Sequence, residues 1–207
     1  MKKAGLILVC CLLTTAAFGQ GKVIFENDSN HLVYWNPNPA LSAGFAPGEP
    51  VGVGGGPSGL SLAVDLYMGT ASATLSLVAT TSLSLTPVNP GQWTPATVGL
   101  PGFPSGTALF TQVQVRDLAF PTATAAEAAG GVFGFSQEFT VTLGGLTGTP
   151  ITSTWPIGTY PLPPYGYGAI MIGIIPEPPA LGIAGIGAAA FLLSAHRKPC
   201  GKTPRVL

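Results

Sequence analysis

A polar turn near the N-terminus holds the residue types that come closest to a catalytic group. His31 follows Asp28 and Ser29 within three positions, and Ser, His and Asp are the members of a hydrolase triad. Three near neighbours in one turn cannot align as nucleophile, base and orienting acid, because a working triad draws them from separate elements. We therefore expect a turn in which Asn and Asp side chains bond their own backbone.

Carboxylates suggest two other kinds of chemistry. Glu26 and Asp28 could contribute oxygen ligands to Ca²⁺, although two acids in a turn are common without a metal. A glycosidase needs two facing carboxyl groups, and nothing selects such a pair here. The acids available for it are Asp65, Asp117, Glu127 and Glu138.

The charged residues of the middle region are expected to serve the fold. Asp65 alternates with apolar residues, so we expect it to face solvent from a strand. Arg116 is expected to form a structural bridge with Glu127 or Glu138. The sequence therefore predicts a protein that is not an enzyme and has no metal or cofactor.

Aromatic side chains could bind a ligand without catalysing a reaction. Trp93 and Trp155 could stack on sugar rings if they are exposed on a sheet, which makes a carbohydrate-binding module the main alternative function. Core packing is the commoner role for such rings. The same two roles are open to Trp35, Tyr160, Tyr165 and Tyr167.

Alternating apolar and polar residues along short segments predict β-strands as the elements that position these groups. The clearest alternation covers residues 60–67 and 109–116, and the only helix signal is 123–129, which Gly130 and Gly131 end. The pattern predicts an all-β fold, an antiparallel β-sandwich of jelly-roll-like or immunoglobulin-like kind. Further strands are expected at 23–25 and 32–35 (an opening hairpin), 75–78, 83–85, 133–143 and 166–175.

Composition excludes several classes of protein. Charged residues are 8% of the 207, and 29 Gly with 21 Pro disfavour a helical bundle. Residues 20–175 contain two basic side chains against seven acidic ones, a net charge of −5, which disfavours nucleic acid as a partner. The same region has no cysteine, so its fold must hold without disulfides.

The N-terminus has the features of a secretory signal peptide. Lys2 and Lys3 precede an apolar run over 4–13, and Ala17 and Gly19 supply the small side chains that a signal peptidase inspects. We expect cleavage after Gly19, which makes 1–19 the signal peptide. The alternative is an uncleaved membrane anchor, for which the apolar run is short.

A second apolar run without charge covers residues 180–195. As a helix it would be about 24 Å long, and bilayer thinning or snorkelling of the flanking bases can cover the gap to a core of about 30 Å. Arg197 and Lys198 follow and are expected to stop transfer on the cytoplasmic side. The alternative is a buried core helix of the same length.

Pro176, Glu177 and Pro178 stand directly before that run, and the two prolines keep the backbone extended and outside any helix. The order of this triplet, an apolar helix and a basic cluster resembles the PEP-CTERM sorting signal, here residues 176–198. The resemblance implies that an exosortase in the inner membrane reads the triplet, cuts near it and passes the protein to the surface of a Gram-negative bacterium that makes exopolysaccharide. Residues 199–207 continue beyond the signal and are expected to be a cytoplasmic tail.

The middle of the chain is similar to the exported domain found in many PEP-CTERM proteins. This similarity implies a fold and a cellular destination, but no catalytic activity. The segments that carry this similarity are 23–27, 66–69, 112–117, 126–128 and 134–139.

Together these features predict an exported protein with a β-sandwich domain over residues 20–175. A single-pass inner-membrane intermediate would precede release to the cell surface or extracellular matrix. Its expected role is structural or interactive within an exopolysaccharide envelope. Exosortase and signal peptidase are the expected processing partners, and exopolysaccharide is a further candidate partner. A hydrolase is the third hypothesis, which is disfavoured because no histidine is placed for a triad and no pair of facing carboxyl groups is evident.

Overall fold

The computed structural model describes residues 19–42, 44–54, 58–156 and 169–174, all within the compact unit Met1–Ile175. The predicted signal peptide, apart from Gly19, lies outside the described residues, and Ala17 with it. The predicted sorting signal (176–198) and the predicted tail (199–207) also lie outside them. None of the helices in the described ranges has the length and hydropathy needed to cross a membrane.

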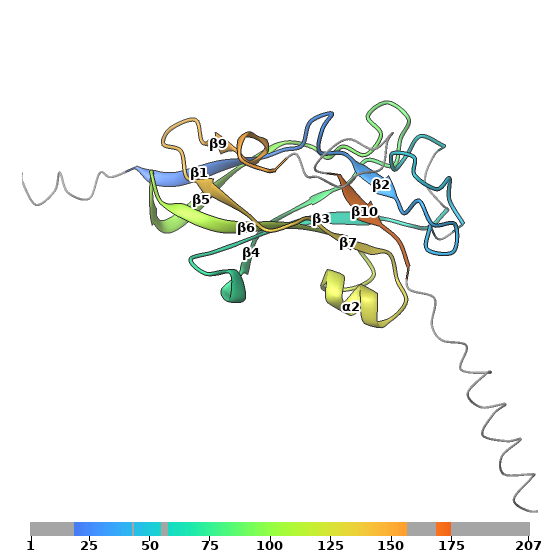
Figure 1. The fold of residues 1–207 in the computed structure, drawn as a ribbon. Helices are drawn as coiled ribbons and strands as arrows, with labels where there is room; N and C mark the ends of the chain where they lie inside the picture. The colour runs from blue at the N-terminus through green and yellow to red at the C-terminus, as the bar shows by residue number, and fades with distance from the viewer. Residues whose placement is uncertain (1–18, 43, 55–57, 157–168, 175–207) are drawn as a thin grey trace, which may run out of the picture. The chain divides into compact units, whose positions relative to one another are not determined.

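The described chain is mostly β-structure, in several sheets with mostly antiparallel pairing, which confirms that part of the sequence-based expectation (Figure 1). Short helical segments join some of the strands. The strands are β1 (Gln20–Phe25), β2 (Val33–Trp35), β3 (Leu62–Gly69), β4 (Ser76–Ser82), β5 (Ala96–Pro104), β6 (Ala108–Asp117), β7 (Phe133–Phe135), β8 (Phe139–Thr142), β9 (Thr149–Pro150) and β10 (Ile170–Ile172). The helical segments are η2 (Ser72–Thr74), α2 (Ala123–Ala128) and η3 (Ile151–Ser153).

Helix α2 lies where the alanine-rich segment predicts it. The Thr122 side chain accepts a hydrogen bond from the backbone N–H of Ala125 and so caps the first turn. Ala123 and Ala126 are fully buried, and α2 packs through them against β6 and β7. Small side chains on one side of the helix therefore let it lie close to the sheet.

The largest sheet has the order β4-β3-β6-β7, and β8 pairs with β6 beyond the end of β7. A second sheet has β1 between antiparallel β5 and parallel β9. A third is the parallel pair β2 and β10. The expected opening hairpin is wrong, because β1 pairs with β5 and β9 on its two sides and β2 pairs elsewhere.

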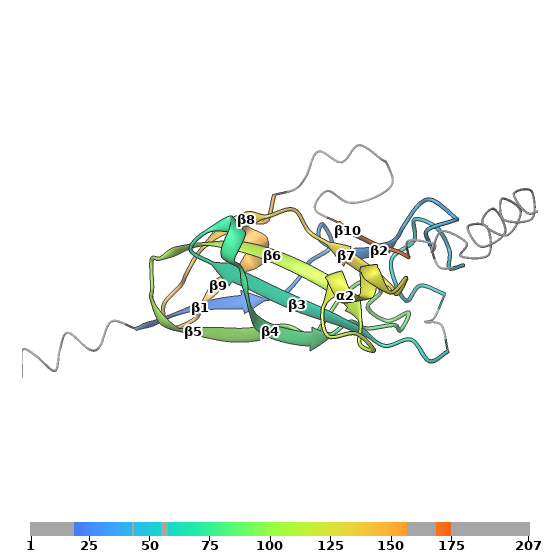
Figure 2. The ribbon, with the colours of Figure 1, turned by 90° about the horizontal axis from the view of Figure 1, so that it is seen from below.

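One apolar core is built from buried side chains of the β1 sheet and the largest sheet, whose strands overlap when seen from below (Figure 2). Val23 and Phe25 reach it from β1, and alternate residues reach it from β3 and β6. The fully buried members from those two strands are Val64, Leu66, Val113 and Val115. The alternation that predicts these strands therefore also identifies the side of each strand that faces the core.

Strand β10 completes the structure from the C-terminal side. Ile170 and Ile172 are fully buried. Beyond the pairing with β2, the backbones of Gly173 and Phe133 exchange two hydrogen bonds of 3.0 Å, so β10 lies between β2 and β7. Gly134 permits this approach, because a Cβ there would lie 2.4 Å from the carbonyl oxygen of Met171.

The close contact at Gly134 gives a prediction for stability. We expect Gly134→Ala to lower the free energy of unfolding by about 1–3 kcal/mol, because the added methyl group pushes against backbone atoms of β10. Denaturant unfolding of the purified protein measures this loss. Gly145→Ala is the matched control, since its Cβ would meet Ser105 Oγ at 3.6 Å. Equal stability of the two variants would contradict the placement of β10.

Candidate functional site

The outer face of the largest sheet gathers aromatic rings and amides. Residues of β3 and β6 that alternate with core residues project away from the core, and the register places Tyr67 opposite Gln112. The next strand places Phe135 opposite Gln114. Phe110 lies on the same side of β6 and is 39% exposed. We call these five residues the amide–aromatic face.

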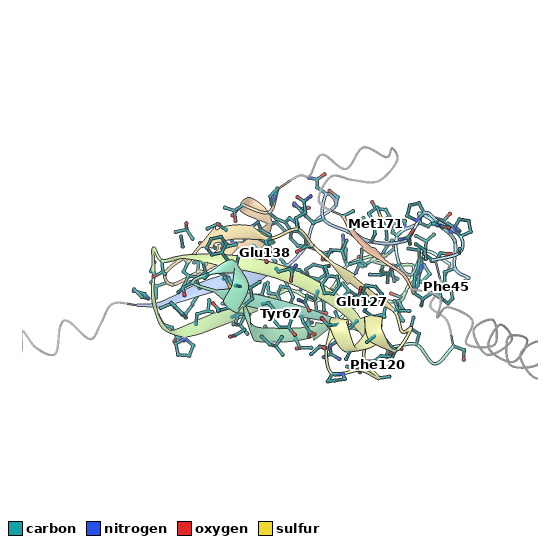
Figure 3. The ribbon with its side chains drawn as sticks, turned by 60° about the horizontal axis from the view of Figure 1, so that its bottom comes forward. Phe45, Tyr67, Phe120, Glu127, Glu138 and Met171 are labelled. Carbon is teal, nitrogen blue, oxygen red and sulfur yellow. The ribbon has the colours of Figure 1, made fainter. Side chains whose placement is uncertain are left out.

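Two acidic side chains, Glu138 and Glu127, lie toward opposite ends of the largest sheet. In Figure 3, Tyr67 is seen on β3, Glu138 lies toward one end and Glu127 of α2 toward the other. Glu138 accepts a hydrogen bond from Ser72 of η2 at 2.5 Å, which ties the β3–β4 connection to the segment before β8. This contact holds η2 against the segment before β8 at one end of the sheet that carries the amide–aromatic face.

Hydrogen bonds hold both amides of this face in place. Gln114 Nε2 donates to Gln112 Oε1 at 2.8 Å, and Gln112 Nε2 donates to the carbonyl oxygen of Ser136 at 3.3 Å. Ser136 Oγ in turn accepts from the backbone N–H of Val113 and donates to the carbonyl of Gln137, both at 2.8 Å. The two glutamines thus form one oriented row rather than two independent side chains.

A buried ion pair lies on the same side of the sheet. Arg116 Nε donates to Asp65 Oδ2 at 2.6 Å, and Thr80 Oγ1 donates to Asp65 Oδ1 at 2.6 Å. Asp65 has no exposed surface and Arg116 is 8% exposed. The Arg116 guanidinium also donates to the carbonyl of Phe120, just before α2. The carboxylate and guanidinium therefore neutralise each other beneath the surface.

This pair corrects two expectations. Asp65 does not face solvent, because β4 and the segment leading into α2 supply partners that cover it. Arg116 pairs with Asp65 instead of Glu127 or Glu138. The physical reason is the register, which places Arg116 opposite Ala63 and therefore diagonal to Asp65 on the neighbouring strand.

The phenol of Tyr67 is affected by the same pair. Burial raises the pKa of Tyr67 above its ordinary value of 10.0, the negative charge of Asp65 raises it further, and Arg116 opposes the shift. At neutral pH the phenol is thus a protonated hydroxyl that can donate a hydrogen bond.

In the turn around His31, the imidazole is buried and both of its nitrogens have partners within the fold. His31 is 2% exposed, its Nδ1 lies 2.6 Å from Asp28 Oδ1 and its Nε2 lies 3.3 Å from the carbonyl oxygen of Trp155. Asp28 Oδ1 also accepts from the backbone N–H of Asn30 at 2.8 Å, which confirms the expected Asp turn. Asn27 bonds the backbone of His31, Gly91 and Trp93, and so directs the chain away from a hairpin.

The tryptophans proposed for sugar stacking are in the core. Trp93 and Trp155 are each 4% exposed. Trp155 stacks on Phe139 with ring centroids 5.2 Å apart, and Trp93 packs on Phe25 at 5.3 Å. Their core-packing role is confirmed, and the interpretation as exposed stacking platforms is wrong for both, because the opposite layer covers them.

Asp28, one of the two acids considered for Ca²⁺, is bonded to His31 and to the backbone of Asn30. Within the ranges the structure describes, no group of three or more His, Cys, Asp or Glu is placed to hold a metal ion. Tyr160, Tyr165 and Tyr167 lie outside those ranges. The described structure also brings together the five members of the amide–aromatic face, which the sequence reasoning missed. The alternation of Gln112 and Gln114 with buried valines was the available signal.

No protein-family model, curated protein or solved structure matches this chain. Its function must therefore be argued from the sequence pattern and from the geometry of the described residues.

The buried ion pair gives a prediction for stability. We expect Asp65→Ala to lower the free energy of unfolding by about 3–5 kcal/mol, because it leaves the Arg116 guanidinium buried without its counter-ion. The double variant Asp65→Leu with Arg116→Met should recover most of the loss. Glu127→Ala is the control and should stay within about 0.5 kcal/mol of the parent protein in the same denaturant titration. A larger loss for Glu127→Ala than for Asp65→Ala would refute the pairing.

Tyr67 gives a prediction for alkaline pH. A raised pKa in the folded state favours the protonated phenol, so the stability that it contributes is fully present below about pH 10 and is lost as pH rises through the folded value. We expect Tyr67→Phe to unfold less steeply with rising pH than the parent protein. Tyrosinate absorbance and thermal unfolding above pH 9.5, about half a unit below that ordinary value, measure both effects. Identical pH profiles would show that Tyr67 is not perturbed.

Proposed function

We propose that this chain is an exported protein of a bacterial surface or extracellular matrix, with a structural or interaction role in an exopolysaccharide envelope. The observation that carries the proposal is the order of Pro176-Glu177-Pro178, the apolar run 180–195 and the basic pair Arg197 and Lys198. An N-terminal signal peptide over residues 1–19 complements it.

The three parts have distinct physical roles in this proposal. The prolines of the triplet keep it extended, so that an exosortase active site can reach its backbone. The apolar run forms a single transmembrane helix and holds the substrate in the inner membrane. Arg197 and Lys198 keep the tail in the cytoplasm until the cut releases the domain.

The end of the described domain supports this order. Strand β10 ends at Ile172 and Ile174 still donates its backbone N–H to the carbonyl of Leu41 at 2.9 Å. Pro176 is only two residues further along the chain. A cut near the triplet would thus leave β10, and with it the whole described fold, on the exported product.

We further propose that the two facing layers are an antiparallel β-sandwich of jelly-roll-like or immunoglobulin-like kind. One core with alternate residues from β1, β3 and β6 supports this assignment. The role is proposed to be non-enzymatic, because His31 and the Asp65–Arg116 pair already have structural partners.

A carbohydrate-binding module is the second candidate function. The buried Trp93 and Trp155 do not support it, whereas the amide–aromatic face does. This candidate and the matrix role are compatible, since binding to a polysaccharide is one way to interact with the envelope.

The sorting proposal predicts the fate of a single substitution. We expect the Glu177→Ala protein to stay in the inner-membrane fraction at its uncut size, because the exosortase no longer recognises the triplet. Membrane fractionation of the producing bacterium, followed by intact-mass measurement, shows both the location and the chain ends. The parent protein should begin at Gln20 and end near the triplet. Lys202→Ala is the control beyond the signal and should be processed normally, and normal processing of Glu177→Ala would exclude the proposal.

A further inference from the structure

We infer that the amide–aromatic face, formed by Tyr67, Phe110, Gln112, Gln114 and Phe135, binds an uncharged polysaccharide chain. The inference gives a site to the interaction role proposed above and rests on that role. It does not depend on the sorting signal, because binding can be measured with the unprocessed protein.

The amide row supplies directional hydrogen bonds. Gln114 Nε2 donates to Gln112 Oε1, and no hydrogen bond within the described ranges uses Gln114 Oε1. Gln112 Nε2 has a second N–H beyond the one given to Ser136. An oriented acceptor and an oriented donor on one row match neighbouring sugar hydroxyls, each of which both donates and accepts.

The rings supply apolar surface beside each amide. Tyr67 lies directly across from Gln112, and Phe135 lies directly across from Gln114, so the Cβ atoms of each pair are about 4.5–5.5 Å apart. Phe110 extends the face along β6 and is 39% exposed. From Phe110 to Gln114 the strand rises about 13 Å, which suits several linked sugar units rather than a single ring. Aromatic rings with a polar neighbour fit a ligand that has both C–H faces and hydroxyl groups.

The charge around the face restricts the ligand to an uncharged one. Asp65 and Arg116, the ionised groups nearest the amide row on the same strands, are buried and neutralise each other. Lys22 is the remaining basic residue of the described ranges and lies on β1, in the other sheet. An anionic polysaccharide, nucleic acid or lipid would therefore meet no cation here, and Glu127 and Glu138 toward the sheet ends would repel it.

A second copy of this chain is the competing occupant, because the three rings of the amide–aromatic face could pack against the same face of another molecule. The fixed amides favour the polysaccharide. Two rows of like amides brought together would need complementary placement, whereas sugar hydroxyls rotate to suit either group.

The test uses the full chain purified in detergent and affinity electrophoresis through gels that contain a polysaccharide. The probes are a neutral β-glucan, a neutral mannan and the neutral fraction of the producing bacterium's own exopolysaccharide, with alginate as the anionic contrast. We expect retardation by at least one neutral probe and none by alginate. Retardation by alginate alone, or by none of the probes, would overturn the inference.

Substitutions locate the binding. Gln112→Ala with Phe110→Ala should weaken retardation about tenfold or more, the equivalent of about 1.4 kcal/mol. Trp93→Phe is the matched control and should bind as the parent does, since Trp93 is buried. Thermal unfolding of each variant shows whether it folds. If the double variant does not fold, the single variant Phe110→Ala is tested for binding instead. Unchanged binding by a folded face variant overturns the assignment to this face.

Two further readouts separate the outcomes. Light scattering measures the mass of the detergent-solubilised protein, and a dimer that dissociates only in the face variants would assign the face to self-association and overturn the inference. If no neutral probe binds while Glu177→Ala still blocks processing, the sorting proposal stands and only the polysaccharide site fails.

Discussion

The buried ion pair between Asp65 and Arg116 joins four segments of the chain. Thr80 brings in β4, the carbonyl of Phe120 brings in the approach to α2, and the pair itself connects β3 with β6. Removing two charges from water is costly, so the arrangement holds only when every partner is present. Because the charges cancel below the surface, the exposed part of the same sheet presents amides and rings without a local field.

Local patterns were enough to predict much of the fold. Alternation predicted β3 and β6 and identified the side of each that faces the core, and the alanine-rich segment 123–129 predicted α2. Pairing was beyond the reach of the same patterns. The parallel contacts of β1 with β9 and of β2 with β10 join segments that are far apart in sequence, and alternation contains no information about a partner strand.

In the candidate site, too, the sequence predicts which way a side chain faces but not which strands lie side by side. Gln112 and Gln114 alternate with valines, so their outward orientation could be inferred from sequence. The rings beside them could not, because Tyr67 and Phe135 reach β6 only through the register of two other strands. For Trp93 and Trp155 the residue type left both exposure and core packing open, and the packing of Phe25 and Phe139 against them places both in the core.

Strand β10 has a consequence for the order of events during synthesis. Its partner β2 is made early, whereas Ile170 and Ile172 are among the last described residues to leave the ribosome. Until then the space between β2 and β7 stays open and the native sheet cannot close. The parallel pair of β2 and β10 therefore forms only after nearly all of the described chain has been synthesised, which makes this contact a late step of folding.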